Sequence, residues 1–405
     1  MKGKPERGGN RVQEKNELRK RFCLLFSLVL TAALCWRWQR IFYLMCADYI
    51  LSDMPNHIRL ALGHNDYSLA SWIVRALWAA LGESRGQTAL SLVLTINQLL
   101  GVLAVWALLR ELFPELEKSG AYLAALLAHV CATWLLPIPG QTEMYLAAYS
   151  GNVLHNMTML FSRTPLPLAL LFFFRLWDGR GGRLNTRDWL GFLLTLLLST
   201  FFKPSFLGAF APAAFVLLVI DFVRTRCRGF KNEFLIGLAV IPSLLVLLWS
   251  SSVLYAEDFA GTSSGMTLRV LSLSALFALL LRYLRGLLLP LWGLSERREL
   301  DRERRGRLGI LDWVLSVSIL EAMFLAETGF RANDGNFEWG SLALYPTVFA
   351  AAIALLLLLW QRPEKDRKTR IRAIIGIVLL LGHLLTGAWC LHVPGHVGGY
   401  HWFYF

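Results

Sequence analysis

The sequence predicts an all-α polytopic membrane protein, and three observations carry that prediction. Hydrophobic residues make up 56% of the 405 residues, and the mean hydropathy is +0.48. Charged residues make up 17%, whereas soluble proteins usually carry about 25%. Apolar runs of about 20 residues recur from Phe22 to Leu391, and each is long enough to cross a bilayer. No remaining stretch is large enough for a separate soluble core.

The apolar runs predict about eleven transmembrane helices. They cover residues 22–45, 88–109, 120–138, 156–174, 189–202, 205–223, 234–254, 266–284, 309–327, 339–360 and 373–391. The fifth run is short and ends at Lys203-Pro204, so it is expected to stop within the membrane. The 6 cysteines are scattered singly, which argues against a zinc motif or a disulfide framework.

The positions of the basic residues predict the orientation. With the amino terminus in the cytoplasm, most of the 41 lysines and arginines fall on the cytoplasmic side, as the positive-inside rule requires. Residues 1–21 then form a basic cytoplasmic tail, and residues 392–405 form a short outer tail rich in aromatics and histidine. The net charge of +13 is therefore an orientation signal that also attracts anionic lipid headgroups. No nucleic-acid motif accompanies it, so a multi-pass protein of the plasma membrane is expected.

The first outer loop, residues 46–87, is the longest and carries the strongest candidates. Ser52 or Asp53 can cap a helix whose first turn contains Pro55. His57 follows Asp53 by four residues and so shares its helix face. One interpretation makes Asp53 only a cap, and the other makes it a carboxylate held at the lipid surface beside an imidazole.

A second amphipathic segment follows in the same loop. Its apolar positions repeat with helical spacing, and they are Leu69, Trp72, Ile73, Ala76, Leu77 and Ala80. Ser68, Ser71 and Arg75 lie opposite. Both segments are too short or too polar to span, so two interfacial helices are expected.

Three further features of the outer side are candidates. Arg163 lies inside the fourth apolar run, where it needs either a core carboxylate or a ligand phosphate. Lys203 stands at a proline break between two runs and is either a phosphate ligand or a snorkelling lysine. The loop from Glu327 to Gly340 mixes charge, glycine, amide and aromatic residues, which is typical of functional loops. Three histidines in the last 14 residues follow no recognised metal-ligand spacing.

Several segments resemble the GT-C class of membrane glycosyltransferases, which use polyprenyl-phosphate sugars, and in particular a poorly characterised bacterial group of that class. They are Ser52-Asp53-Met-Pro-Asn-His57, Asn152-Val-Leu-His155-Asn156-Met-Thr158, Lys203-Pro204-Ser205, Glu327-x-Gly-x-Arg331 and Gly335-Asn336-Phe337-x-Trp339-Gly340. The second segment departs from the pattern, which has Trp in place of Leu154 and Pro in place of Met157. In that class the first outer loop carries an acidic catalytic residue. Asp53 is the best-placed match, and Asp48 is its rival.

The resemblance implies a transmembrane catalytic domain over residues 22–391. It would move a sugar from a polyprenyl-phosphate donor to a glycan, lipid or polymer acceptor of the cell envelope, on the outer face of the membrane. Asp53 would be the general base and His57 its neighbour. Donor-binding residues would be Lys203, Arg163, Arg331, His155 and Asn156, and supporting residues Asp48, Glu327, Asn336 and Glu143. No ligand spacing demands a metal, so participation of a divalent cation stays open.

Two other classes of function compete with this interpretation. A transporter or lipid flippase would place its polar site near the bilayer midplane, often between internal repeats. No convincing repeat relates the two halves of the chain, and the polar groups collect at the outer ends of the runs. A non-catalytic subunit of an envelope-assembly complex is the other alternative.

Overall fold

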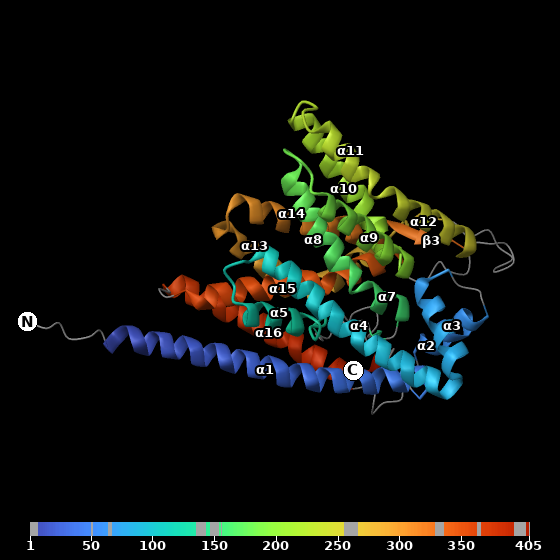
Figure 1. Ribbon diagram of the computed structural model, residues 1–405, viewed down its shortest axis with the longest axis horizontal. Helices are drawn as coiled ribbons and strands as arrows, with labels where there is room; N and C mark the ends of the chain where they lie inside the picture. Colours follow the sequence, from blue (N-terminus) through green and yellow to red (C-terminus); the bar gives the residue numbers. More distant parts are fainter. Residues whose placement is uncertain are drawn as a thin grey trace, which may run out of the picture.

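The structure is a computed structural model that describes residues 7–49, 52–63, 67–134, 143–145, 154, 156–254, 266–328, 336–362, 366–392 and 402–404. Helices cover most of these residues (Figure 1). The first half contains α1 (Arg7–Cys46), α2 (Met54–Leu62), α3 (Leu69–Leu81), α4 (Glu83–Leu112), α5 (Lys118–Ala128), β1 (Glu143–Tyr145), α7 (Met157–Ser162), α8 (Pro165–Gly179) and α9 (Thr186–Phe202).

The second half continues with longer helices and three short strands. These elements are α10 (Ser205–Arg224), α11 (Phe230–Leu238), α12 (Ile241–Leu254), β2 (Met266–Leu268), α13 (Leu273–Glu296), η2 (Arg297–Glu299), α14 (Arg302–Phe324), β3 (Leu325–Glu327), η4 (Asn336–Glu338), α15 (Trp339–Gln361), α16 (Arg367–His392) and β4 (Trp402–Tyr404). β1 pairs antiparallel with β4, and β2 pairs antiparallel with β3.

The protein is an integral membrane protein built from apolar helices. Eight helical segments of the described chain are long and apolar enough to cross a membrane: Lys20–Cys46, Glu83–Leu112, Met157–Gly179, Ser205–Arg224, Phe230–Val253, Leu273–Glu299, Trp339–Gln361 and Arg367–His392. Large apolar side chains such as Phe215 and Leu245 are exposed on the outside of the bundle. Such a surface is stable when lipid covers it.

Several of the expected spans differ from the helices that form. The 156–174 run is divided into α7 and α8, the 234–254 run is divided into α11 and α12, and the 309–327 run ends as strand β3. Two other runs form shorter helices than expected. The 120–138 run forms a helix only to Ala128, where His129 ends α5 and its ring bonds to the carbonyl of Ala125. Ala132 then bonds to the carbonyl of His383 in α16. The 266–284 run begins as strand β2, and its helix α13 starts at Leu273. In both places a tertiary contact takes up backbone groups that a longer helix would have bonded internally.

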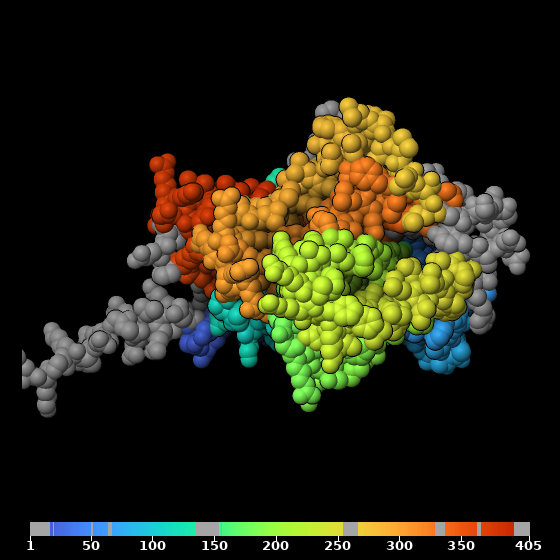
Figure 2. Space-filling model, turned by 90° about the horizontal axis from the view of Figure 1, so that it is seen from above, coloured from blue at the N-terminus to red at the C-terminus, as the bar shows by residue number. Residues whose placement is uncertain are grey.

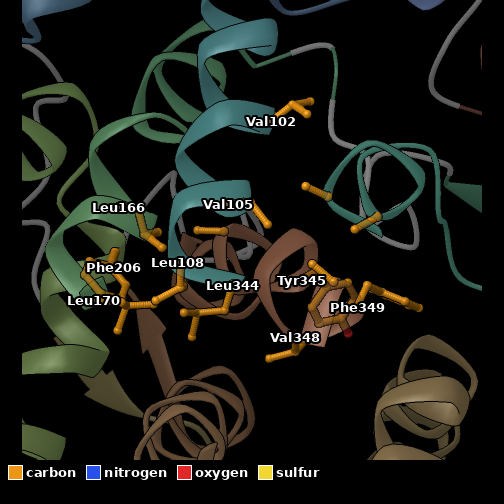
Figure 3. Packing of buried hydrophobic residues seen from close by; sticks show 14 of the residues in the cluster. Val102, Val105, Leu108, Leu166, Leu170, Phe206, Leu344, Tyr345, Val348 and Phe349 are labelled. Carbon is orange, nitrogen blue, oxygen red and sulfur yellow. The ribbon is translucent and has the colours of Figure 1, made fainter. Parts of the chain in front are cut away.

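The core lies between α4, α8, α10 and α15 (Figure 3). Leu108 of α4 and Leu170 of α8 lie beside Phe206 of α10 and Leu344 of α15, and all four are fully buried or nearly so. Dispersion contacts of such close-packed side chains hold apolar helices together when lipid, itself apolar, surrounds them.

Ion pairs connect the helices at one end of the bundle. Arg307 of α14 bonds to Asp178 of α8 at 2.6 Å and to Glu303 at 2.6 Å. Arg175 of α8 bonds to Glu111 of α4 at 2.8 Å. Arg304 with Glu115, Arg362 with Glu299, and Arg372 with Glu296 join the same end. This is the end that the sequence assigns to the cytoplasm.

The opposite end depends on a close approach at Gly340, in the first turn of α15. A Cβ there would lie 2.5 Å from the Ser318 hydroxyl of α14 and 2.9 Å from the Ser205 carbonyl of α10. Glycine therefore lets three helices meet directly beside the Lys203-Pro204 break.

We expect the Gly340→Ala substitution to destabilise the protein by about 1–3 kcal/mol, because the backbone carbonyl of Ser205 cannot move away cheaply. Thermal unfolding of the protein in detergent measures the effect. Gly309→Ala in α14 is the matched control, since a Cβ there meets nothing within 4 Å. It should leave stability unchanged or raise it by up to about 1 kcal/mol through helix propensity. Equal melting temperatures for both variants would contradict the packing assignment.

Candidate active site

Elements that the sequence assigns to the outer side lie at the end of the bundle opposite the ion pairs. Helices α2, α3 and α7 lie there, on the right in Figure 1, together with β3. The C-terminus of α9 and the N-terminus of α15 reach the same region, as the contacts below establish.

Asp53 begins helix α2 but does not cap it with its side chain. Its backbone is already helical, and its carboxylate makes no capping hydrogen bond. Instead the Ser52 hydroxyl accepts from the amide of Met54 at 3.2 Å, and Pro55 occupies the first turn, where no amide is needed. Ser52, and not the Asp53 carboxylate, is therefore the capping group at the start of α2.

Asp48, the rival acid, has a different place in the chain. It is exposed and adopts φ +58°, in the left-handed region. The amide of Tyr49 bonds across it to the Leu44 carbonyl at 2.9 Å. This is the geometry of a Schellman C-cap, in which aspartate is one of the few residues that tolerate the left-handed conformation. Asp48 therefore ends α1, and its position is explained without catalysis.

Asn156 fixes the proton on His57. The Oδ1 atom of Asn156 accepts from the amide of Met159 at 3.0 Å and from the hydroxyl of Thr158 at 2.8 Å. The amide of Met159 can only donate, so the Nδ2 group of Asn156 is the one that faces His57, 3.3 Å from its Nε2. An amide Nδ2 only donates. The Nε2 atom of His57 is therefore an acceptor, and the neutral ring carries its proton on Nδ1.

Helix α7 links this pair to the end of α9. Phe161 of α7 stacks on Phe202, the last residue of α9, with ring centroids 5.1 Å apart. Ser68, the N-cap of α3, donates its hydroxyl to the Phe202 carbonyl at 3.0 Å and accepts from the amide of Ala70. Helices α3 and α7 thus both contact Phe202, the residue that precedes Lys203.

Lys203 joins the same region to the N-terminus of α15. It ends α9 in an extended conformation before Pro204, and its Nζ lies 4.6 Å from the centre of the Trp339 ring. Trp339 begins α15, and the residue before it, Glu338, forms an ion pair with Arg282 of α13, with one bond of 3.1 Å. That pair fixes the N-terminus of α15, and with it the aromatic face under Lys203.

Arg163 sits deeper, at the break between α7 and α8. It is 3% exposed and donates to the side-chain oxygen of Gln98, midway along α4, at 3.2 Å. Its neighbour Thr164 donates to the carbonyl of Asn97 at 3.1 Å, and the Asn97 amide donates to the Leu160 carbonyl at 2.6 Å. Of the two alternatives for Arg163, a core role is the one that these contacts favour, and one of its partners is the amide of Gln98.

Helix α3 turns its polar side toward the protein. Ser71 is fully buried, while Trp72 is 48% exposed, and Arg75 donates to the Ala61 carbonyl of α2 at 3.1 Å. Of the apolar stripe expected from the sequence, Trp72, Ala76 and Ala80 are exposed, which suits a helix at a lipid interface, whereas Ile73 and Leu77 pack against the core.

For the remaining candidate residues the structure describes fewer contacts or none. Glu327 is 8% exposed and pairs through the backbone of β3 with Met266. Arg331 and His155 lie outside the described residues. Only the backbone elements that contain Glu143 and Asn336 are described. Among the residues searched, no group of three or more histidine, cysteine or acidic side chains gathers as a metal site.

Sequence reasoning missed several residues of this region, namely Asn97, Gln98, Ser68, Arg282 and Trp339 as the partner of Lys203. For two of them a signal existed, because Asn97 and Gln98 interrupt an apolar run and polar groups inside a span usually have a partner.

Comparison with solved structures finds chains of similar structure. A crystal structure of ArnT from Cupriavidus metallidurans bound to undecaprenyl phosphate is similar to this chain with a TM-score of 0.49 and 11% sequence identity. The likeness covers 92% of this chain and 73% of that one. No protein-family model matches the chain, and no curated protein matches it by sequence.

Substitution of Asn156 separates its two roles. Asn156→Ala removes both the N-cap of α7 and the donor to His57, and we expect a loss of about 0.5–2 kcal/mol in stability. Asn156→Ser keeps an N-cap acceptor but does not reproduce the amide donor. Serine should therefore restore most of the stability lost in the alanine variant, as measured by thermal unfolding. Equal stability of the alanine variant and the unsubstituted protein would show that Asn156 is not a cap.

Proposed function

We propose that this protein is a membrane glycosyltransferase that transfers a sugar from a polyprenyl-phosphate donor to an acceptor of the cell envelope, at the outer face of the plasma membrane. The proposal rests on the resemblance of the loop motifs to the GT-C class. One structural observation supports it most. A continuous series of contacts joins the Asp53–His57 helix, Asn156, the end of α9, Lys203 and Trp339.

The proposed reaction uses Asp53 as general base. Its carboxylate takes the proton of an acceptor hydroxyl as the hydroxyl oxygen attacks the anomeric carbon of the donor sugar. The bond between that carbon and the phosphate oxygen breaks, and the lipid phosphate leaves with the bonding electrons. A carboxylate base contributes about 10²–10⁴-fold to such a rate. His57, with its proton on Nδ1, serves to orient the base or the acceptor rather than to accept a proton through Nε2.

The leaving phosphate needs positive charge. Lys203 stands at the helix break where a lipid phosphate at the membrane surface would lie, and Arg331 of the fifth outer loop is assigned beside it. Preorganised charge of this kind often contributes more than the base. Asn156, His155 and Asn336 are assigned to sugar or phosphate oxygens, and Glu327 to orienting Arg331 or the acceptor. Arg163 is assigned a structural role at the α7–α8 break, since its described partner, Gln98, lies in α4.

Asp53→Asn should lower the rate of transfer from a purified polyprenyl-phosphate sugar by about 10²–10⁴-fold. Asparagine keeps the shape of the side chain and the start of α2 but cannot take a proton. Asp301→Asn is the matched control, because Asp301 is also an N-cap aspartate, at the opposite end of the bundle. Asparagine caps helices as well as aspartate does, so the control should retain full activity. Full activity in the Asp53 variant as well would exclude Asp53 as the base.

Lys203→Met should lower kcat/KM for the lipid-linked donor by about 10²–10³-fold, the usual effect of removing one group that stabilises a developing oxyanion. Methionine retains the apolar contact with Trp339 but not the charge. Steady-state transfer assays at several donor concentrations measure the loss, with Lys118→Met at the other end of the bundle as the control. If the two methionine variants lose activity equally, Lys203 does not hold the donor.

A further inference from the structure

A basin of about 1110 Å³ lies at the ion-paired end of the bundle, opposite the end that holds the candidate active site. The loop between α8 and α9, the end of α10 and the start of α11 form its walls. The α10–α11 region stands at the top of Figure 1 and faces the viewer, in yellow-green, in Figure 2.

The basin is strongly basic. Five exposed cations line it, and none of them has an ion pair among the contacts of the described chain: Arg183, Arg224, Arg226, Arg228 and Lys231. Its two carboxylates are already engaged. Asp221 bonds to Arg180 at 2.6 Å, and Asp178 bonds to Arg307 at 2.6 Å. The charge left to face a ligand is therefore positive.

Hydrogen bonds fix the α8–α9 loop, which forms one wall of the basin. The Asn232 amide of α11 donates to the carbonyls of Arg180 and Gly182, at 2.7 and 2.6 Å. The Arg180 guanidinium lies 4.0 Å from the centre of the Trp177 ring. These bonds tie the α8–α9 loop to α11, so the cations need little reorganisation to meet a ligand.

The rim contains two successive residues in an unusual conformation. Arg226 and Cys227 have φ values of +52° and +67°, where glycine is the usual residue. Such outliers cluster at ligand sites. Here they reverse the chain between α10 and α11 and so bring Arg224 and Arg228 to the same basin.

An exposed apolar surface continues from the basin. Val223 at the end of α10 is 67% exposed, and Phe230 and Phe234 on α11 are 56% and 58% exposed. The Phe230 ring also contacts Phe222, with centroids 5.7 Å apart. A soluble anion would use only the cations, whereas a lipid has both a charged headgroup and chains that such a surface can cover.

We propose that the basin binds the headgroup of an anionic phospholipid, with a two-phosphate headgroup preferred, and that the acyl chains lie along Phe230 and Phe234. Basic pockets between helices at the cytoplasmic surface recognise such headgroups. The site is independent of the glycosyltransferase proposal, since it shares no residue with that site.

Lipid titration of the full-length protein in neutral detergent, read by native mass spectrometry, tests the proposal. Diphosphatidylglycerol should bind more tightly than phosphatidylglycerol, and phosphatidylethanolamine weakest. The triple variant R183Q/R224Q/R228Q should bind diphosphatidylglycerol more than about tenfold more weakly. The matched control R298Q/R302Q/R305Q removes the same charge from the same end of the bundle, outside the basin, and should change affinity less than about threefold. If both triple variants lose the same affinity for diphosphatidylglycerol, the lipid is held by diffuse electrostatic attraction and not by the basin. That result would overturn the proposal.

A second pair of measurements separates lipid from soluble phosphate. F230S/F234S should weaken diphosphatidylglycerol binding but leave binding of inorganic pyrophosphate unchanged. The F230S/F234S variant tests the lipid assignment even if the arginine triple variant does not fold. If pyrophosphate binds as tightly as the lipid, or if F230S/F234S binds the lipid normally, the basin is a site for a soluble anion and the lipid assignment is wrong.

Discussion

This structure depends on hydrogen bonds to the backbone groups that are exposed where helices break. The surroundings of these breaks are apolar. Lipid offers no hydrogen bonds, so each break must find partners within the protein. At the α7–α8 break, Asn97 of α4 supplies an amide to the Leu160 carbonyl and accepts from Thr164. At the α9–α10 break, Ser68 supplies a hydroxyl to the Phe202 carbonyl. The loops that carry candidate residues are anchored by those same bonds.

Charge is divided between the two ends of the bundle in different ways. At the ion-paired end the carboxylates are matched to arginines, as Asp178 is to Arg307 and Asp221 to Arg180, so they stabilise the packing of helix ends. At the other end Lys203 lies over an indole. A ring face attracts a cation without cancelling its charge.

The sequence was sufficient for features that depend on local pattern. Hydropathy predicted α4, α10, α15 and α16 closely, and Lys203-Pro204 predicted the end of α9. Pairings across the fold could not be predicted, because His57 and Asn156 are 99 residues apart. The orientation of α3 also needed the structure. An apolar stripe predicts burial against protein only when the surroundings are water, and here Trp72 faces outward. The length of α5 depended on a contact with α16.

The proposed role of His57 at the candidate site depends on the orientation of the Asn156 side-chain amide. Because the Met159 amide occupies Oδ1 of Asn156, only Nδ2 can meet His57. An imidazole that accepts at Nε2 is neutral and offers its Nδ1 proton to a neighbour. It therefore adds no positive charge beside Asp53, and it can act there as a donor. The proposed function assigns the base and the cation to different elements, the start of α2 for the carboxylate and the end of α9 for the lysine. The proposed transfer uses both groups, because a proton is removed from the acceptor while negative charge develops on the departing phosphate.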